Sequence, residues 1–70
     1  MVIDESYKYS LPLFKESQDS EIDVQEVVRG CSVRYENGNP TFYKEGYIPK
    51  TFPNDFIDFF FSIGYISKEE

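Results

Sequence analysis

The segment from Thr51 to Ile66 constrains the fold of this chain most, because it contains five of the seven phenylalanines. Pro53 suits the first turn of a helix, where a missing N–H costs nothing. Asp55 lies in the same turn, where a carboxylate interacts favourably with the helix dipole. Gly64 fits the left-handed position at which many helices end. These signals predict a helix over residues 53–63 that builds the core of the domain.

Apolar residues cover an arc of about 200° on this helix, which is wider than the stripe of about 100° that an ordinary surface helix needs. Either the helix packs deeply into a small sheet, or one flank meets a partner or a second copy of the chain. Phe59 and Phe61 are the residues expected on that flank. Beyond the helix, Tyr65 is expected to pack back on Phe60.

A β-hairpin over residues 31–48 is the best-supported local motif. Asn37 and Gly38 provide the two positive-φ residues of a type I′ turn. With a two-residue loop, Val33 pairs with Phe42. A longer loop is the alternative, because the proline that follows the turn cannot donate to a strand ladder.

Two other segments contain signals that fit more than one structure. Alternating apolar residues over 7–13 predict a half-buried strand, and Pro12 predicts that it lies at the sheet edge or ends at the proline. Residues 20–29 fit a helix, because Ser20 and Gly30 suit its two ends. The β-branched residues of the same segment favour a strand instead. We favour the helix.

Together these patterns predict one α+β domain over residues 1–70. Its expected architecture is a three-stranded antiparallel sheet, made of an edge strand and the Asn-Gly hairpin, packed by the Phe-rich C-terminal helix. A second short helix is expected at 20–29. Residues 1–6 and 67–70 are expected to fray, although the tail could add a residue or two of strand. A chain of 70 residues has a small core, so we expect a stability of only a few kcal/mol.

The composition argues against an enzyme. The chain has no histidine and one cysteine, Cys31, which excludes an internal disulfide, a zinc site of the usual kind and a histidine-activated nucleophile. Asp19, Glu21 and Asp23 have the spacing of calcium-loop ligands, but the glycine and glutamate of that loop are missing. No glycine-rich phosphate loop is present. We therefore predict no catalytic residue, no metal and no cofactor.

No apolar run approaches the roughly 20 residues that a membrane-spanning helix needs, and the polar N-terminus does not resemble a signal peptide. We therefore expect a cytoplasmic protein that does not bind membranes. Its net charge of −6 is uneven. Residues 1–26 hold seven acidic and two basic residues. This excess disfavours direct binding to nucleic acid and favours a protein partner with a basic surface.

Five carboxylates with no basic residue among them form what we call the acidic stretch: Glu16, Asp19, Glu21, Asp23 and Glu26. One interpretation is a solvated surface that keeps a small protein soluble. The other is an electrostatic decoy that occupies the groove in which a partner binds DNA phosphates. Asp55 and Asp58, on the polar side of the predicted C-terminal helix, could extend this acidic face.

In length, acidity, aromatic content and lack of catalytic residues, the whole chain resembles the small early proteins that phages make to disable host machinery. Several members of that class are DNA mimics that inhibit uracil-DNA glycosylase, restriction enzymes or HU-type nucleoid proteins. The resemblance is one of overall character and carries no motif. It implies an inhibitor that acts in the host cytoplasm on a nucleic-acid-binding protein.

The alternative hypothesis is an interaction module that docks a protein partner, or a second copy in a homodimer, through exposed aromatic side chains. The residues expected to form that surface are Tyr43, Tyr47, Phe59 and Phe61. The two hypotheses differ in salt dependence, because ionic contacts are screened by salt and apolar contacts are not.

Overall fold

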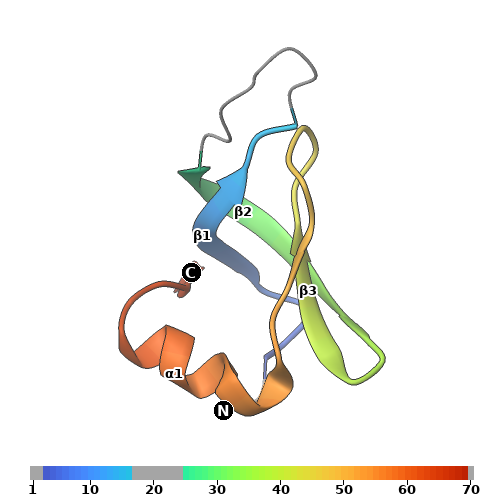
Figure 1. Ribbon diagram of the computed structural model, residues 1–70, viewed down its shortest axis with the longest axis vertical. Helices are drawn as coiled ribbons and strands as arrows, with labels where there is room; N and C mark the ends of the chain where they lie inside the picture. Colours follow the sequence, from blue (N-terminus) through green and yellow to red (C-terminus); the bar gives the residue numbers. More distant parts are fainter. Residues whose placement is uncertain (1–2, 17–24, 70) are drawn as a thin grey trace.

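The computed structural model describes residues 3–16 and 25–69. In these residues the chain forms a five-stranded antiparallel sheet and one short α-helix (Figure 1). The elements are β1 (Lys8–Phe14), β2 (Gln25–Glu36), β3 (Asn39–Tyr43), β4 (Lys50–Thr51), the 3-10 helix η1 (Asn54–Phe56), α1 (Ile57–Ser62) and β5 (Ser67–Glu69). The predicted α+β class is confirmed, whereas the three-stranded sheet is wrong. Within the described ranges, no helix is long and apolar enough to cross a membrane.

The strand order is β4-β3-β2-β1-β5, and β2 holds the two halves of the sheet together. Its first part pairs with β1, and its last part pairs with β3. After β3 the chain turns back toward the end of β1, as Figure 1 shows. There Ile48 N–H donates to the Phe14 carbonyl at 2.9 Å, and Glu16 N–H donates to the Gly46 carbonyl at 3.0 Å. The sheet therefore curls until a segment beyond β3 bonds to β1.

The predicted hairpin is confirmed in its turn and its register. Asn37 and Gly38 have φ angles of 54° and 82°, as a type I′ turn requires. Val33 pairs with Phe42 across β2 and β3. The longer loop is wrong, because β3 begins directly after the turn at Asn39.

The first strand differs from its prediction. β1 continues through Pro12 to Phe14 and has neighbours on both sides, so it is not an edge strand. β5 pairs only with Lys8 to Ser10. Pro12 therefore lies in the part of β1 that β5 does not reach, where its missing N–H removes no bond to that strand.

The helix predicted at 20–29 is wrong over residues 25–29, which belong to β2. Residues 20–24 lie outside the described ranges. Tyr9 pairs with Cys31 and Leu11 with Val28, so two residues of β2, one of them Gly30, lie opposite a single residue of β1. This is a β-bulge, and the φ of 73° at Gly30 serves the bulge and not a helix end. The β-branched valines of this segment favour a strand, and this preference outweighs the helix-end signals of Ser20 and Gly30.

The core lies inside the curled sheet and not along the helix. Its buried side chains come from the central strands and from the segments around α1: Leu11, Leu13, Cys31, Val33, Phe42, Phe52, Ile57 and Ile66 are among them. The helical segment is shorter than the predicted 53–63, and Ile57 is its only buried residue. The expectation that this helix builds the core is therefore wrong. The helix closes one end of the molecule (Figure 1).

The end of the helix follows the prediction. Gly64 has a φ of 79°, and Tyr65 N–H donates to the Phe60 carbonyl at 3.0 Å. The Tyr65 and Phe60 rings lie 5.6 Å apart between centroids. Part of the two segments that we expected to fray takes part in the fold, since Ile3 is buried and residues 67–69 form β5. Residues 1, 2 and 70 of those segments lie outside the described ranges.

Burial raises the pKa of the Cys31 thiol, and the buried thiol makes a testable contribution to alkaline stability. A thiol in the unfolded chain has a pKa of about 8.5. Because the folded pKa is higher, this contribution is fully present below about pH 8.5 and is lost as pH rises through the folded pKa. We expect urea-unfolding free energies to fall more steeply between pH 8 and pH 10 in the wild type than in Cys31→Ala. Equal pH slopes for the two proteins would contradict this role.

Candidate functional site

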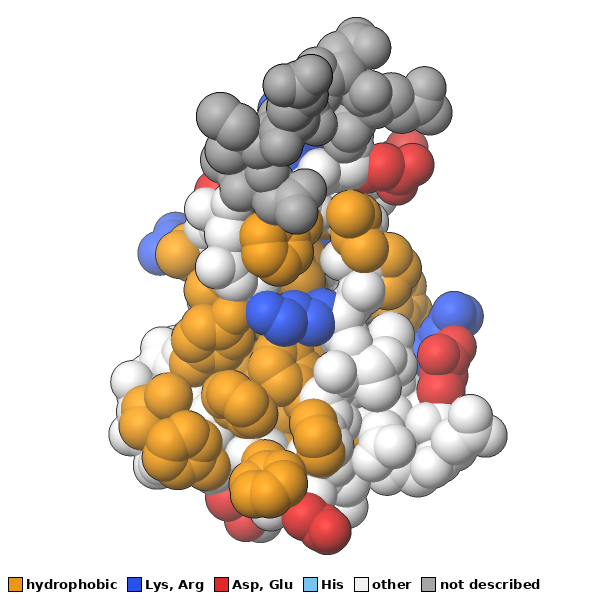
Figure 2. Space-filling model, in the orientation of Figure 1, with side chains coloured by type: hydrophobic (Ala, Val, Ile, Leu, Met, Phe, Trp, Pro, Cys, Tyr) orange, Lys and Arg blue, Asp and Glu red, His pale blue; other side chains and the backbone are white. Residues whose placement is uncertain are grey.

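Three large apolar side chains lie exposed on one flank of η1 and α1. Phe56 is 60% exposed, Phe59 57% and Ile63 56%. Their spacing of three and four residues places them on one face of the helical segment. Half-buried Phe60 and Tyr65 adjoin them. We call these five residues the aromatic patch. Figure 2 shows hydrophobic side chains gathered over the end of the molecule that carries α1.

The patch exists because the helix has two apolar faces. Ile57 points into the core, and Phe60 and Phe61 pack against the core from the same side. The Phe61 ring meets Tyr9 at 5.8 Å between centroids, so it is turned inward. The wide apolar arc predicted from the sequence is thus divided. One part docks the helix, and the other part, which contains Phe59, faces solvent.

A continuous series of ring contacts joins the patch to the core. Phe60 contacts Phe59 at 5.7 Å and Phe52 at 4.8 Å between centroids. Phe52 in turn meets the fully buried Phe42 at 5.6 Å. Edge-on contacts of this kind are favourable beyond the area they bury. The exposed rings therefore rest on a fixed framework of buried ones.

Backbone contacts fix the start of the helical segment against β3. Asn54 N–H donates to the Asn39 side-chain oxygen at 3.0 Å. Phe52 N–H donates to the Pro40 carbonyl, also at 3.0 Å. These bonds hold the segment beside the turn of the hairpin, so that the patch is pre-formed. Pre-formed surfaces lose less entropy when they bind.

A lysine lies among aromatic rings beside the patch. The Lys50 ammonium is 5.2 Å from the Tyr65 ring centroid, 5.4 Å from that of Phe52 and 5.8 Å from that of Phe14. It also donates a hydrogen bond to the Tyr65 hydroxyl at 2.9 Å, and Gln25 donates to the same oxygen at 2.7 Å. Figure 2 shows a basic side chain surrounded by hydrophobic ones on this face. Three ring faces stabilise the cation.

The Lys50 ammonium has no carboxylate partner in the part of the chain that the structure describes. Its ring partners come from β1, from the residues after β4 and from the residues after α1. The sequence analysis missed this site, because no local pattern brings those three segments together. The only signal was the closeness of Lys50 to Phe52 in the chain.

The carboxylates of the predicted acidic face lie in two places. Glu16 lies just beyond the end of β1, and Glu26 belongs to the start of β2, where it pairs with Leu13, three residues before Glu16. Asp55 and Asp58 are exposed on η1 and α1, which Figure 1 shows at the other end of the molecule. Asp19, Glu21 and Asp23 lie outside the described residues. The structure therefore places Glu16 and Glu26 near the same end of the β1–β2 pair, whereas Asp55 and Asp58 lie on the helical segment.

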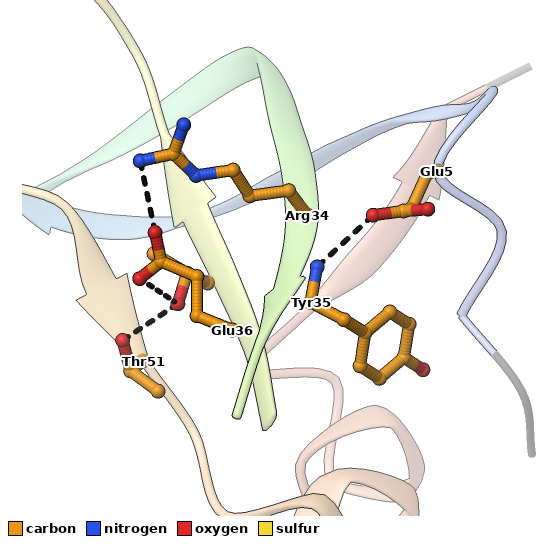
Figure 3. A network of polar contacts seen from close by, with 6 residues as sticks. Glu5, Arg34, Tyr35, Glu36 and Thr51 are labelled. Atoms are coloured by element: carbon orange, nitrogen blue, oxygen red, sulfur yellow. Dashed lines mark hydrogen bonds and ion pairs between the residues drawn. The ribbon is translucent and has the colours of Figure 1, made fainter. Parts of the chain in front are cut away.

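Several other carboxylates make contacts within the fold. Glu36 pairs with Arg34 at 2.9 Å and accepts a hydrogen bond from the Thr41 hydroxyl at 3.4 Å (Figure 3). The Tyr35 N–H donates to Glu5 at 3.0 Å, which ties the N-terminal segment to β2. Thr41 and Thr51 bond each other at 2.7 Å between β3 and β4. The Arg34–Glu36 pair is solvent-exposed and contributes at most about 1 kcal/mol.

Tyr43 and Tyr47, the other predicted aromatic contacts, lie apart from the patch. The Arg34 guanidinium covers the Tyr43 ring at 5.2 Å from its centroid. The Tyr47 hydroxyl donates to Glu26 at 2.6 Å, and this hydrogen bond raises the pKa of Tyr47. Among the described residues, neither ring contacts a ring of the aromatic patch.

An open polar hollow lies beside the bulge of β2. The residues that line it are Ser10, Arg29, Gly30, Ser67, Lys68 and Glu69. The Glu69 carboxylate already accepts a hydrogen bond from Gly30 N–H at 3.0 Å. The Gly30 N–H at this hollow is therefore already hydrogen-bonded to a carboxylate of the chain itself. The aromatic patch is the stronger candidate for a functional site.

Comparisons of the chain with protein-family models, with curated proteins and with solved structures found no match. The function must therefore be argued from the site itself.

Proposed function

We propose that this protein is a non-enzymatic interaction module that docks a protein partner through the aromatic patch. The observation that carries the proposal is the exposure of Phe56, Phe59 and Ile63, each more than half exposed, on one face of a short helical segment. Single exposed apolar residues are ordinary on a protein surface, but a contiguous group of this kind marks an interaction site.

The chemistry of the patch suits protein recognition. Each square ångström of apolar surface removed from water contributes about 25 cal/mol, before the entropy cost of association is subtracted. Aromatic rings provide much area with few rotatable bonds, and they dominate the binding energy of many interfaces. The rings beneath the patch hold Phe59 and Phe60 in place. A partner that offers an apolar surface would therefore bind with little ordering of this chain.

A capture experiment with matched variants tests the proposal. The protein is immobilised and exposed to bacterial lysate at about 0.1 M and 0.5 M NaCl, and bound proteins are identified by mass spectrometry. We expect a partner that stays bound at high salt, because apolar contacts are not screened. The same partner, once purified, should bind Phe59→Ser at least about tenfold more weakly than the wild type.

Tyr43→Ser is the matched control, because it removes an exposed ring that lies on β3 and not on the helical segment. It should leave the affinity unchanged. A partner that is lost with Tyr43→Ser and retained with Phe59→Ser would place the docking surface on the hairpin and contradict the proposal.

A second candidate function is an acidic decoy for a nucleic-acid-binding protein with a basic surface, such as an HU-type nucleoid protein or a DNA-processing enzyme. It is favoured by the position of Glu16 and Glu26 near the same end of the β1–β2 pair, on either side of the connection that carries Asp19, Glu21 and Asp23 in the sequence. In this case the captured partner should be released at 0.5 M NaCl. Binding should also be lost when all five carboxylates of the acidic stretch are changed to amides.

A further inference from the structure

A line of contacts runs across the aromatic patch from a positive to a negative charge. The Lys50 ammonium lies over Tyr65, whose ring meets Phe60 at 5.6 Å. Phe60 meets Phe59 at 5.7 Å. Asp55 precedes Phe59 by four residues, about one helical turn, so the two side chains are neighbours on the surface of the helical segment. An ammonium therefore lies at one end of the aromatic line and a carboxylate at the other.

This arrangement is complementary to itself. In a dimer with a two-fold axis, a residue of one copy faces a different residue of the other copy. The axis repeats this contact, so the same pair forms twice. With the axis near Phe60, the middle of the line, Lys50 of one copy lies opposite Asp55 of the other. The rings of the two copies then cover each other between the two charge pairs. Such a contact would give the Lys50 ammonium the carboxylate partner that the described residues do not provide.

We propose that the aromatic patch binds a second copy of this chain in a symmetric dimer, with Lys50 of each copy facing Asp55 of the other. The inference rests on the proposed function, and it names a second copy of the chain as a partner of the same patch. A partner that carried only basic groups would meet the Lys50 ammonium with repulsion. A partner without a carboxylate would cover that ammonium and give it no counter-charge, which is costly.

The dimer should be weak. The patch rests on one nine-residue helical segment, η1 followed by α1, and its immediate neighbours. An interface built on it belongs to the small class that transient complexes use. We therefore expect a dissociation constant on the order of 100 µM. Sedimentation equilibrium between about 10 µM and 1 mM covers this range.

The first variant removes a ring from the middle of the interface. Phe59→Ser should raise the dissociation constant at least about tenfold, whereas the control Tyr43→Ser should leave it unchanged. Circular dichroism of both variants checks that the fold is kept. A Phe59→Ser protein that dimerises as the wild type does would show that another face associates, and would overturn the proposal.

The second experiment exchanges the charges. Lys50→Glu alone and Asp55→Lys alone should each weaken self-association by about three- to tenfold, because each homodimer then brings like charges together twice. An equimolar mixture of the two variants contains heterodimers in which both pairs are opposite in sign. We expect this mixture to associate as tightly as the wild type. A mixture that associates no more tightly than the separate variants would overturn the proposed pairing.

Lys50→Glu places a carboxylate against three rings, a change that can prevent folding. In that case the charge test uses Asp55, which is exposed. Asp55→Lys should then weaken the dimer more than Asp55→Asn does. A wild type that stays monomeric up to 1 mM would overturn the second-copy proposal alone. The proposed function would then still be decided by whether Phe59→Ser loses a captured partner.

Discussion

Phe42→Ala is expected to leave the protein largely unfolded at 25 °C. The Phe42 ring is completely buried, and it contacts Tyr9 and Phe52 edge-on, each at 5.6 Å between centroids. Truncation of a buried phenylalanine costs about 3 to 5 kcal/mol, because apolar area is lost and a cavity remains. The whole domain is expected to be stable by only a few kcal/mol. Circular dichroism and urea unfolding measure the loss directly.

Phe59→Ala provides the matched control, since the same atoms are removed from a side chain that is 57% exposed. We expect its unfolding free energy to lie within about 0.5 kcal/mol of the wild type. If both substitutions destabilised the fold equally, Phe59 would belong to the core, and the aromatic patch would not be a free surface.

Ile57→Ala should have the second largest effect, a loss of about 2 to 4 kcal/mol. Ile57 is the one residue of α1 that is fully buried, and the six-residue helix is too short to be stable alone. Its docking therefore depends on this side chain, with help from Phe60 and Phe61. Urea unfolding should show the loss, and fluorescence of a hydrophobic dye should increase as the helix detaches from the sheet.

Ile63→Ala removes the same atoms from the exposed side of the segment, where Ile63 is 56% exposed. This variant should keep the stability of the wild type and lose self-association. The reverse result, a destabilised Ile63→Ala that still dimerises, would show that we have assigned the two faces of the helix wrongly.

The parts of the fold that the sequence predicted correctly are those that local chemistry determines. Asn37 and Gly38 accept the positive φ angles of a tight turn, and this fixes the pairing of Val33 with Phe42. Gly64 ends the helix for a similar reason. Such signals depend on a few neighbouring residues, so the packing of distant segments changes them little.

The wrong predictions concern contacts between distant segments. Gly30 is compatible with a helix end and with a bulge, and only the pairing of Tyr9 with Cys31 and of Leu11 with Val28 decides between them. The phenylalanines after Pro53 predicted a helix at the centre of the core. Most of the buried core comes from the curled sheet, and Ile57 is the only buried residue of the helix, so part of the helix remains at the surface.

The candidate site was predicted only in part. The wide apolar arc indicated that a flank of the helix could meet a partner, and Phe59 is exposed there. The rings around Lys50 come from three segments that are far apart in the sequence, so no periodicity could reveal them. For Asp19, Glu21 and Asp23, the acidic reading stays a prediction.

The curl of the sheet has a consequence for how far this protein can assemble. Main-chain hydrogen bonds let proteins add strand to strand without limit, as they do in amyloid. Here the two outer strands, β4 and β5, are only two and three residues long. The segment before β4 is bonded to Phe14 at the end of β1 and to Glu16 beyond it. The outer strands therefore offer only two and three residues of edge to another chain. The proposed contact through side chains on a two-fold axis ends at two copies and does not grow into a fibre.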